Sequence, residues 1–412
     1  MTIDTSSLSR RGLIRTAGKV TAAAALTAPF RGVGVGVGGV AWAASSPKTY
    51  RKWIYAKPMA DNKLTLDQFK MVEEPMPDVP QGKCLIEVKV LNIHSGTRSR
   101  LGGQTKLGDT DKSNYACARV IKSRDKSFKE GDIIACQAGW QTHQVISSED
   151  ESIGYGPANE MTIALNGTKS HWNYVFRPQM VKMWSPEILM DVFGTSGTTA
   201  YFGMRECGPI MPTDQVAVAG TTGSVGALAA QLVKARGAYC VGFGGGPERA
   251  KWCVDTLGVD KGLDYRAKDL DAQLKAAFPK GIDVYSDGVG GSLSESIAKL
   301  MNPNSRYFSY GTAAAYYDEN PAQVVGRNAG RLFGMSDSVE KIIKEKNIKL
   351  EAWIVHVFYY DRLKCEDDLS HLLLNKQIKP INNVVEGFEN APKGIISQYT
   401  DNPYGKLQLK FA

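Results

Sequence analysis

The chain has 412 residues, of which 43% are hydrophobic and 22% charged, and its formal net charge is +8. Half of that charge lies in residues 1–44, and the remainder has both signs dispersed. This composition is that of an ordinary globular protein with room for two domains, and it argues against a basic nucleic-acid-binding surface.

The first 44 residues are predicted to be a twin-arginine signal peptide. Arg10 and Arg11 precede a short apolar pair, as in twin-arginine export signals, and Ala41-Trp42-Ala43 offers a small-residue cleavage site. The stretch between them is glycine-rich and is broken by Pro29 and Arg31, so no stable membrane insertion is expected. The expected location is the periplasm, or the cytoplasm if the leader is not used. The alternative is a disordered basic N terminus or a wrongly assigned start.

Residues 46–197 are predicted to form a β-rich domain. They contain many short apolar runs, such as residues 84–90, separated by Gly, Pro, Asn and Asp. Residues 149–178 are polar and irregular, which is typical of a surface insertion, although a lid or a substrate loop is also possible.

Residues 216–243 are predicted to form a strand, a glycine-rich turn, a helix and a second strand. The turn spans residues 220–226 and contains Gly220, Gly223, Ser224, Val225 and Gly226, and a run with helical spacing follows it. Glycines let the backbone approach a pyrophosphate, while the helix N terminus directs free N–H groups toward it. In this strand-to-helix context the turn predicts a dinucleotide site, the alternative being a tight turn of an unrelated α/β protein.

The end of the second strand favours NADP(H) over NAD. An NAD site places an acidic residue in this region, but residues 240–244 contain none. A glycine loop that includes Gly245 follows, and then Arg249. A guanidinium can bind a 2′-phosphate through two parallel hydrogen bonds. The alternative is that Arg249 is a solvated charge on a helix face.

Strand and helix patterns alternate from residue 198 to residue 345, which predicts a doubly wound parallel sheet. A strand at 349–357, an amphipathic helix at 362–375 and a closing strand at 407–411 follow. Within the alternating region, helices are predicted at 247–257, 270–277 and 293–300, and strands at 261–265, 282–287 and 306–310.

In order and spacing, several motifs resemble those of the zinc-independent medium-chain dehydrogenase/reductases, especially the prostaglandin, alkenal and curcumin reductases. The resemblance implies an α/β fold with an N-terminal β-rich, GroES-like catalytic domain (46–197 and 348–412) and an NADP-binding Rossmann domain (198–347). The motifs are Gly139-Trp140-Gln141, residues 199–203, the glycine turn, residues 246–249, Leu257-Gly258, Asp264-Tyr265, residues 281–285, residues 289–291, residues 386–392 and Gly405-Lys406.

The resemblance implies NADPH-dependent reduction of a carbon–carbon double bond conjugated to a carbonyl group. It implies that Tyr265 joins Arg249 at the 2′-phosphate and that Gly311 and Asn402 contact the cofactor. Tyr316 would donate a hydrogen bond to the substrate carbonyl oxygen, where enolate charge develops. The alternative for Tyr316 is a packing role in a tyrosine-rich loop.

Some positions depart from the family pattern. Residues 94–100 keep two arginines but lack the family's acidic and aromatic residues, and asparagines are lost at 286–291 and 403–406. Two alternatives therefore stay open: an exported enzyme with tightly bound NADP that catalyses coupled or redox-neutral chemistry, and a non-catalytic ligand-binding descendant. The expected partners are a small-molecule substrate and a second copy of the chain, with no nucleic acid.

No metal site is predicted. The seven cysteines and five histidines are scattered along the chain, without the spacing of a tetrahedral zinc site. Cys240 falls in a predicted buried strand, which indicates an unreactive core residue.

Overall fold

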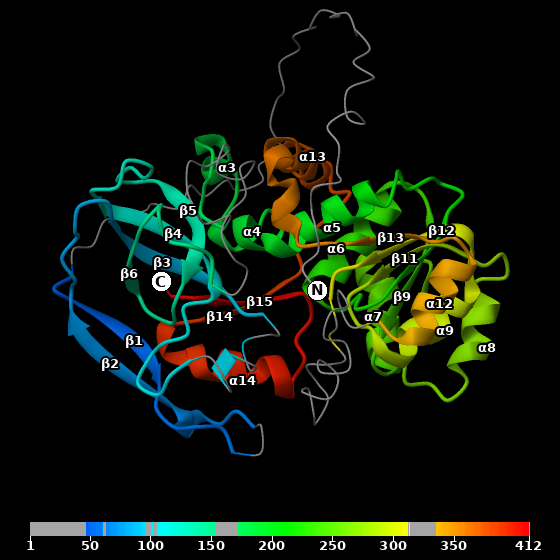
Figure 1. Ribbon diagram of the computed structural model, residues 1–412, viewed down its shortest axis with the longest axis horizontal. Helices are drawn as coiled ribbons and strands as arrows, with labels where there is room; N and C mark the ends of the chain where they lie inside the picture. The colour runs from blue at the N-terminus through cyan, green and yellow to red at the C-terminus, as the bar shows by residue number, and fades with distance from the viewer. Residues whose placement is uncertain are drawn as a thin grey trace, which may run out of the picture. The chain divides into compact units, whose positions relative to one another are not determined.

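The computed structural model describes residues 47–60, 63–94, 97, 100–101, 105–153, 172–311, 313 and 335–411. These residues form two large sheets, one mixed and one parallel, with helices beside them (Figure 1). This arrangement confirms the predicted α/β fold class. A separate antiparallel hairpin is formed by β1 (Thr49–Tyr55) and β2 (Phe69–Pro75). No helix among the described residues is both long and apolar enough to span a membrane.

The mixed sheet has the strand order β14-β15-β3-β4-β5-β7, and β6 pairs with β3. The C-terminal part of the chain therefore joins the N-terminal strands, because β15 lies antiparallel to β3 while β14 lies parallel to β15. The strands are β3 (Cys84–Asn92), β4 (Asn114–Ser123), β5 (Ile133–Ala138), β6 (His143–Ile146), β7 (Tyr174–Val175), β14 (Asn382–Glu386) and β15 (Lys406–Lys410).

The parallel sheet has the order β10-β9-β8-β11-β12-β13, in which every neighbouring pair is parallel. The strand order reverses between β8 and β11, and in open parallel sheets ligands bind at the carboxyl ends of the strands beside such a reversal. The strands are β8 (Gln215–Val218), β9 (Tyr239–Gly244), β10 (Lys261–Asp264), β11 (Ile282–Asp287), β12 (Met301–Ser309) and β13 (Lys349–Ala352).

Both faces of the parallel sheet are buried, as its apolar strands require. Val216 and Val218 pack into one core cluster, whereas Ala217 and Ala219 pack into another on the opposite face. The flanking helices are α5 (Thr195–Glu206), α6 (Ser224–Ala235), α7 (Pro247–Leu257), α8 (Leu270–Ala277), α9 (Gly291–Leu300) and α12 (Asp337–Glu345) (Figure 1).

The predicted strand at 349–357 is only partly correct. β13 ends at Ala352, and a 3-10 helix, η3, covers Val355–Asp361. The aromatic side chains after Ala352 pack as separate rings instead of alternating across a sheet, since Phe358 stacks on Phe202 of α5 at 5.5 Å. In addition, β13 pairs with β12 of the parallel sheet, although the predicted boundary places residue 348 onward in the β-rich domain.

Residues 178–191 are helical and not β-structured, which the sequence did not predict. α3 (Pro178–Met183) and α4 (Pro186–Asp191) each begin with proline. Proline suits the first helical position because its missing N–H would have no partner there. The C-terminal part adds α13 (Arg362–Leu374), the 3-10 turn η4 (Phe388–Asn390) and α14 (Ala391–Thr400).

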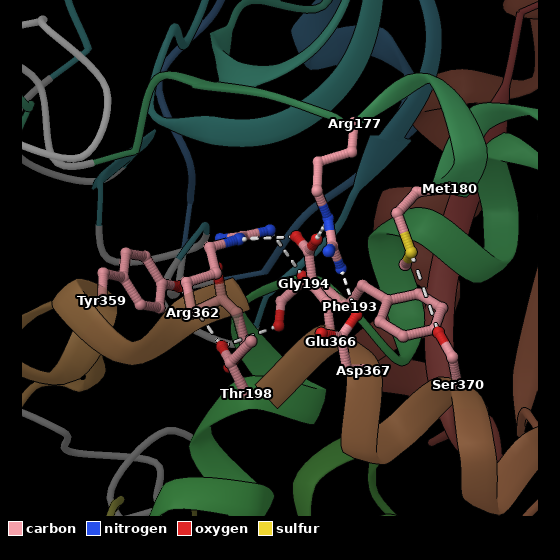
Figure 2. A network of polar contacts seen from close by, with 11 residues as sticks. Arg177, Met180, Phe193, Gly194, Thr198, Tyr359, Arg362, Glu366, Asp367 and Ser370 are labelled. Atoms are coloured by element: carbon pink, nitrogen blue, oxygen red, sulfur yellow. Dashed lines mark hydrogen bonds and ion pairs between the residues drawn. The ribbon is translucent and has the colours of Figure 1, made fainter. Parts of the chain in front are cut away.

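A buried ion-pair network fixes α13 against the segment that leads from the mixed sheet to the parallel sheet (Figure 2). The Glu366 carboxylate, fully buried, accepts hydrogen bonds from Arg362 Nε at 3.1 Å and from Arg177 Nε at 3.0 Å. Arg362 also donates to the Phe193 carbonyl at 2.8 Å, and its guanidinium lies 3.8 Å from the centre of the Tyr174 ring. Each buried charge therefore has a partner, without which burial would be strongly unfavourable.

A second set of contacts joins the same segments. The hydroxyls of Thr198, in α5, and Tyr359, in η3, lie 3.2 Å apart, and Thr198 donates to the Gly194 carbonyl at 2.9 Å (Figure 2). Ser370 of α13 donates to the Met180 sulfur of α3 at 3.7 Å. The start of α5 is thus held by residues that follow it by more than 150 positions, and α5 in turn packs along α6.

All seven cysteines are free and buried. Burial raises the pKa of the Cys240 thiol, which confirms the predicted unreactive core position. The described residues contain no group of three or more His, Cys, Asp or Glu side chains that could hold a metal ion.

Candidate functional site

The glycine turn connects β8 to α6 through a very close approach of backbone to backbone. Gly220 has a φ of +66° and accepts a hydrogen bond from the Gly223 amide at 2.9 Å. A Cβ on Gly226 would collide with the Gly220 carbonyl oxygen. Gly223 is the N-cap of α6 and provides no side-chain cap, so the N–H groups at Ser224 and Val225 face the turn without a side-chain acceptor from the cap.

Thr221 ties this turn to the neighbouring strand. Its side chain is fully buried, and its hydroxyl donates to the Val218 carbonyl and accepts from the Phe243 amide at 2.9 Å. The turn after β8 and the end of β9 are therefore locked together. The role of Thr221 cannot be recognised in the sequence, because its acceptor and its donor come together only when β8 and β9 pair.

Arg249 and Tyr265 lie on either side of the loop after β9. A Cβ on Gly245 would lie 2.9 Å from the Tyr265 hydroxyl, so this ring rests directly on the glycine. Arg249, in the first turn of α7, packs against Gly244. The Asp264 carboxylate accepts from the Gly246 amide at 2.8 Å and shapes the loop. The structure thus gathers three of the predicted cofactor residues at the ends of β9 and β10.

The Arg249 guanidinium is held by the C-terminal segment. Its Nη2 donates to the carbonyls of Asp401 at 3.1 Å and Asn402 at 2.6 Å. Its Nη1 is buried and has no hydrogen-bond partner among the described residues. Arg249 is therefore not a solvated helix charge, and one of its donors still lacks an acceptor.

The predicted residue Asn402 lies in this same segment, with a left-handed φ of +46°. Three residues later, the Gly405 amide donates to the Thr222 carbonyl at 2.8 Å, and Gly405 forms a bridge with Gly223. One short stretch of the C-terminal region thus touches both the glycine turn and Arg249.

Gly311 lies against Gly288, in the segment that follows β11. A Cβ on Gly311 would lie 3.2 Å from the Gly288 carbonyl oxygen, and the preceding Tyr310 donates from its hydroxyl to the Ala219 carbonyl at 3.2 Å. Burial raises the pKa of Tyr310, so its phenol keeps its proton and supports the turn. Tyr316, the predicted catalytic residue, lies outside the described residues.

Two family models match the chain. Residues 51–153 match the N-terminal domain of oxidoreductase, and residues 224–344 match zinc-binding dehydrogenase. The chain is 25% identical over 383 residues to the NADPH-dependent curcumin reductase of Escherichia coli, covering 88% of this chain and 97% of the relative. It is 26% identical over 348 residues to bovine prostaglandin reductase 1, covering 84% and 94%.

Over most of its length, the chain is thus similar to the medium-chain dehydrogenase/reductases. Its fold agrees with this similarity. The crystal structure of CurA from Vibrio vulnificus has a TM-score of 0.70 at 23% identity, covering 88% of this chain and 99% of that one. The CurA complex with NADPH has a TM-score of 0.68 at 24% identity.

Buried titratable side chains gather where β15 begins, one residue after the bridge to the glycine turn. Lys406 donates to the Ile93 carbonyl at 3.0 Å, and burial lowers its pKa to about 8. Burial raises the pKa of Asp191 to about 7, against the opposing effect of Lys406. Burial, with the charges of Arg100 and Lys406, lowers the pKa of His94 to about 3. The imidazole is therefore neutral at pH 7, whereas the pKa values of Asp191 and Lys406 lie close to 7.

The close approach in the glycine turn leads to a stability prediction. We expect Gly226→Ala to lower the free energy of unfolding by about 1–3 kcal/mol, because the new methyl group meets rigid backbone. Gly223→Ala is the matched control in the same turn, since its Cβ would lie 3.3 Å from the same Gly220 oxygen. Urea unfolding of the full chain measures both variants, and equal losses would contradict the packing argument.

Proposed function

We propose that this chain is an NADPH-dependent oxidoreductase that reduces the carbon–carbon double bond of α,β-unsaturated carbonyl compounds. Its relatives include an NADPH-dependent curcumin reductase, prostaglandin reductase 1 and the (+)-pulegone reductase of Mentha piperita. The observation that carries the cofactor assignment is the buried Arg249 Nη1 without an acceptor, directly after a loop whose preceding strand ends without an acidic residue.

The site fits NADPH at both of its phosphate positions. The uncapped N terminus of α6 and the glycines around it suit a pyrophosphate, through free N–H groups and the positive end of the helix dipole. Arg249, with Tyr265 across the loop, suits the 2′-phosphate. The nearby Asp264 carboxylate already accepts from the amides of Gly246 and Arg266, so it is engaged in shaping the loop.

When bound, NADPH supplies a hydride to the double bond. The protein's part is to hold the dinucleotide in one place and to stabilise negative charge on the carbonyl oxygen of the substrate. Thr221 and Tyr310 fix the turn that receives the phosphates. For the carbonyl oxygen, Tyr316 stays the predicted hydrogen-bond donor. His94 is neutral at pH 7 and brings no positive charge of its own.

The relatives favour catalysis over the two alternatives raised by the sequence. The match spans 88–97% of the length of the curcumin, prostaglandin and pulegone reductases named here, so both halves of those enzymes are represented in this chain. A non-catalytic descendant, or an enzyme limited to redox-neutral chemistry on captive NADP, therefore has less support than a reductase.

The activity is tested by incubating the purified protein with NADPH and a panel of conjugated enals and enones. Their saturated analogues are the matched controls. We expect NADPH oxidation with the conjugated compounds alone, and mass spectrometry should show the saturated carbonyl compound as product. Formation of the allylic alcohol, or no oxidation above background across the panel, would contradict the proposed reaction.

We also propose that the leader directs export to the periplasm, on the basis of Arg10, Arg11 and the small residues that follow. In fractionated bacterial cells, the wild-type protein should appear in the periplasm. There it should lack the leader, residues 1–44. The variant with Arg10→Lys and Arg11→Lys should stay in the cytoplasm at full length. Uncleaved wild-type protein in the cytoplasm would contradict export.

The chain is further proposed to form a homodimer through the edge of its parallel sheet. β13 is the last strand on the β12 side of the sheet in the described part of the chain, and Leu350 on it is 40% exposed. Unpaired strand edges are suited to pairing with another chain. Light scattering should give twice the chain mass of 44.8 kDa, and Leu350→Lys should lower it. A monomeric wild-type mass would rule the dimer out.

A further inference from the structure

The Arg249 guanidinium makes an aromatic contact in addition to its hydrogen bonds. It lies over the ring of Tyr404, 4.4 Å from the ring centre. Tyr404 follows Asp401 and Asn402, the two residues whose carbonyls accept from Nη2. One segment therefore surrounds the guanidinium with two carbonyl oxygens and an aromatic face, and leaves Nη1 as a donor without an acceptor among the described residues.

The Tyr404 ring is itself fixed from two directions. It stacks on Trp252 with ring centres 4.4 Å apart and planes 27° apart. Trp252 lies three residues after Arg249 in α7, so both side chains occupy the same face of that helix. On its other side, Tyr404 precedes Gly405, which is bound to Thr222 and Gly223 of the glycine turn. The ring therefore lies against α7, and the residue that follows it is bound to the turn.

We propose that Tyr404 is a positioning residue for cofactor specificity: it orients the Arg249 guanidinium so that the free edge meets a 2′-phosphate. This inference rests on the proposed NADPH dependence and extends it to a residue of the C-terminal segment. A guanidinium that is already oriented loses little freedom when phosphate binds, so its preference for NADPH over NADH is larger than that of a mobile side chain.

The proposal is tested by fluorescence titration of the full chain with NADPH and with NADH. For Tyr404→Leu, we expect the NADPH dissociation constant to rise about tenfold, as loss of a cation–π contact at a partly buried site predicts, while NADH binding stays unchanged. Tyr404→Phe keeps the ring face and should bind both nucleotides like the wild type. Arg249→Ala is the reference for complete loss of the preference.

Each outcome decides one of the two claims. If Tyr404→Leu weakens NADPH and NADH equally, or weakens neither, the positioning role is wrong, because a merely structural ring would not discriminate. If Arg249→Ala abolishes the preference while Tyr404→Leu keeps it, the NADPH assignment stands and only the positioning fails. If the wild type has no preference, the cofactor assignment itself fails. Should Tyr404→Leu not fold, Trp252→Leu removes the support of the ring and is judged by the same criteria.

Discussion

The fold around the site depends on one buried carboxylate, Glu366, which two arginines share. Arg177 reaches it from the segment that leaves the mixed sheet, and Arg362 reaches it from the start of α13. Removal of the Glu366 carboxylate would leave the buried Arg362 guanidinium without its counter-charge, at a cost of about 3–5 kcal/mol. Because Arg362 also binds the Phe193 carbonyl just before α5, the network sets where α5 begins. α5 packs along α6, whose first residues are the phosphate-binding end of the site.

The dinucleotide site is not made by the parallel sheet alone. The glycine turn and the loop after β9 supply two phosphate-binding ends, but residues 401–405 connect them through hydrogen bonds to Thr222 and Arg249. The same segment continues into β15, which pairs with β3 of the mixed sheet. A shift of the C-terminal strand relative to the parallel sheet would therefore change the glycine turn and Arg249 together, so cofactor binding and the placement of the substrate-side strands are mechanically linked.

The sequence predicted correctly those helices and strands whose bounds depend on residues close to them in the chain. The bounds of α7, α8 and β11 match the sequence expectation because apolar spacing is a local property, and because glycines border α7 and β11. The strand predicted at 349–357 failed where ring packing against Phe202 and Phe308 replaced strand alternation. Arg249 lies directly after the loop that follows β9, where the sequence placed it, yet Asp401 and Tyr404 lie more than 150 positions away. A single sequence carries no signal for such a contact, and for the same reason it did not predict that the charges of Asp191 and Lys406 influence each other.

An arginine at position 249 also explains why the C-terminal segment takes the form it does. A lysine ammonium carries its three N–H donors on one nitrogen and has no planar face, whereas a planar guanidinium donates along fixed, separate directions and can lie flat on a ring. Here one edge binds two carbonyls, one face meets Tyr404, and Nη1 remains for an anion. The left-handed backbone of Asn402 places the segment so that consecutive carbonyls converge on Nη2. The geometry of the C-terminal segment and the identity of residue 249 therefore depend on each other. A change to either would alter how the residue at 249 binds a phosphate.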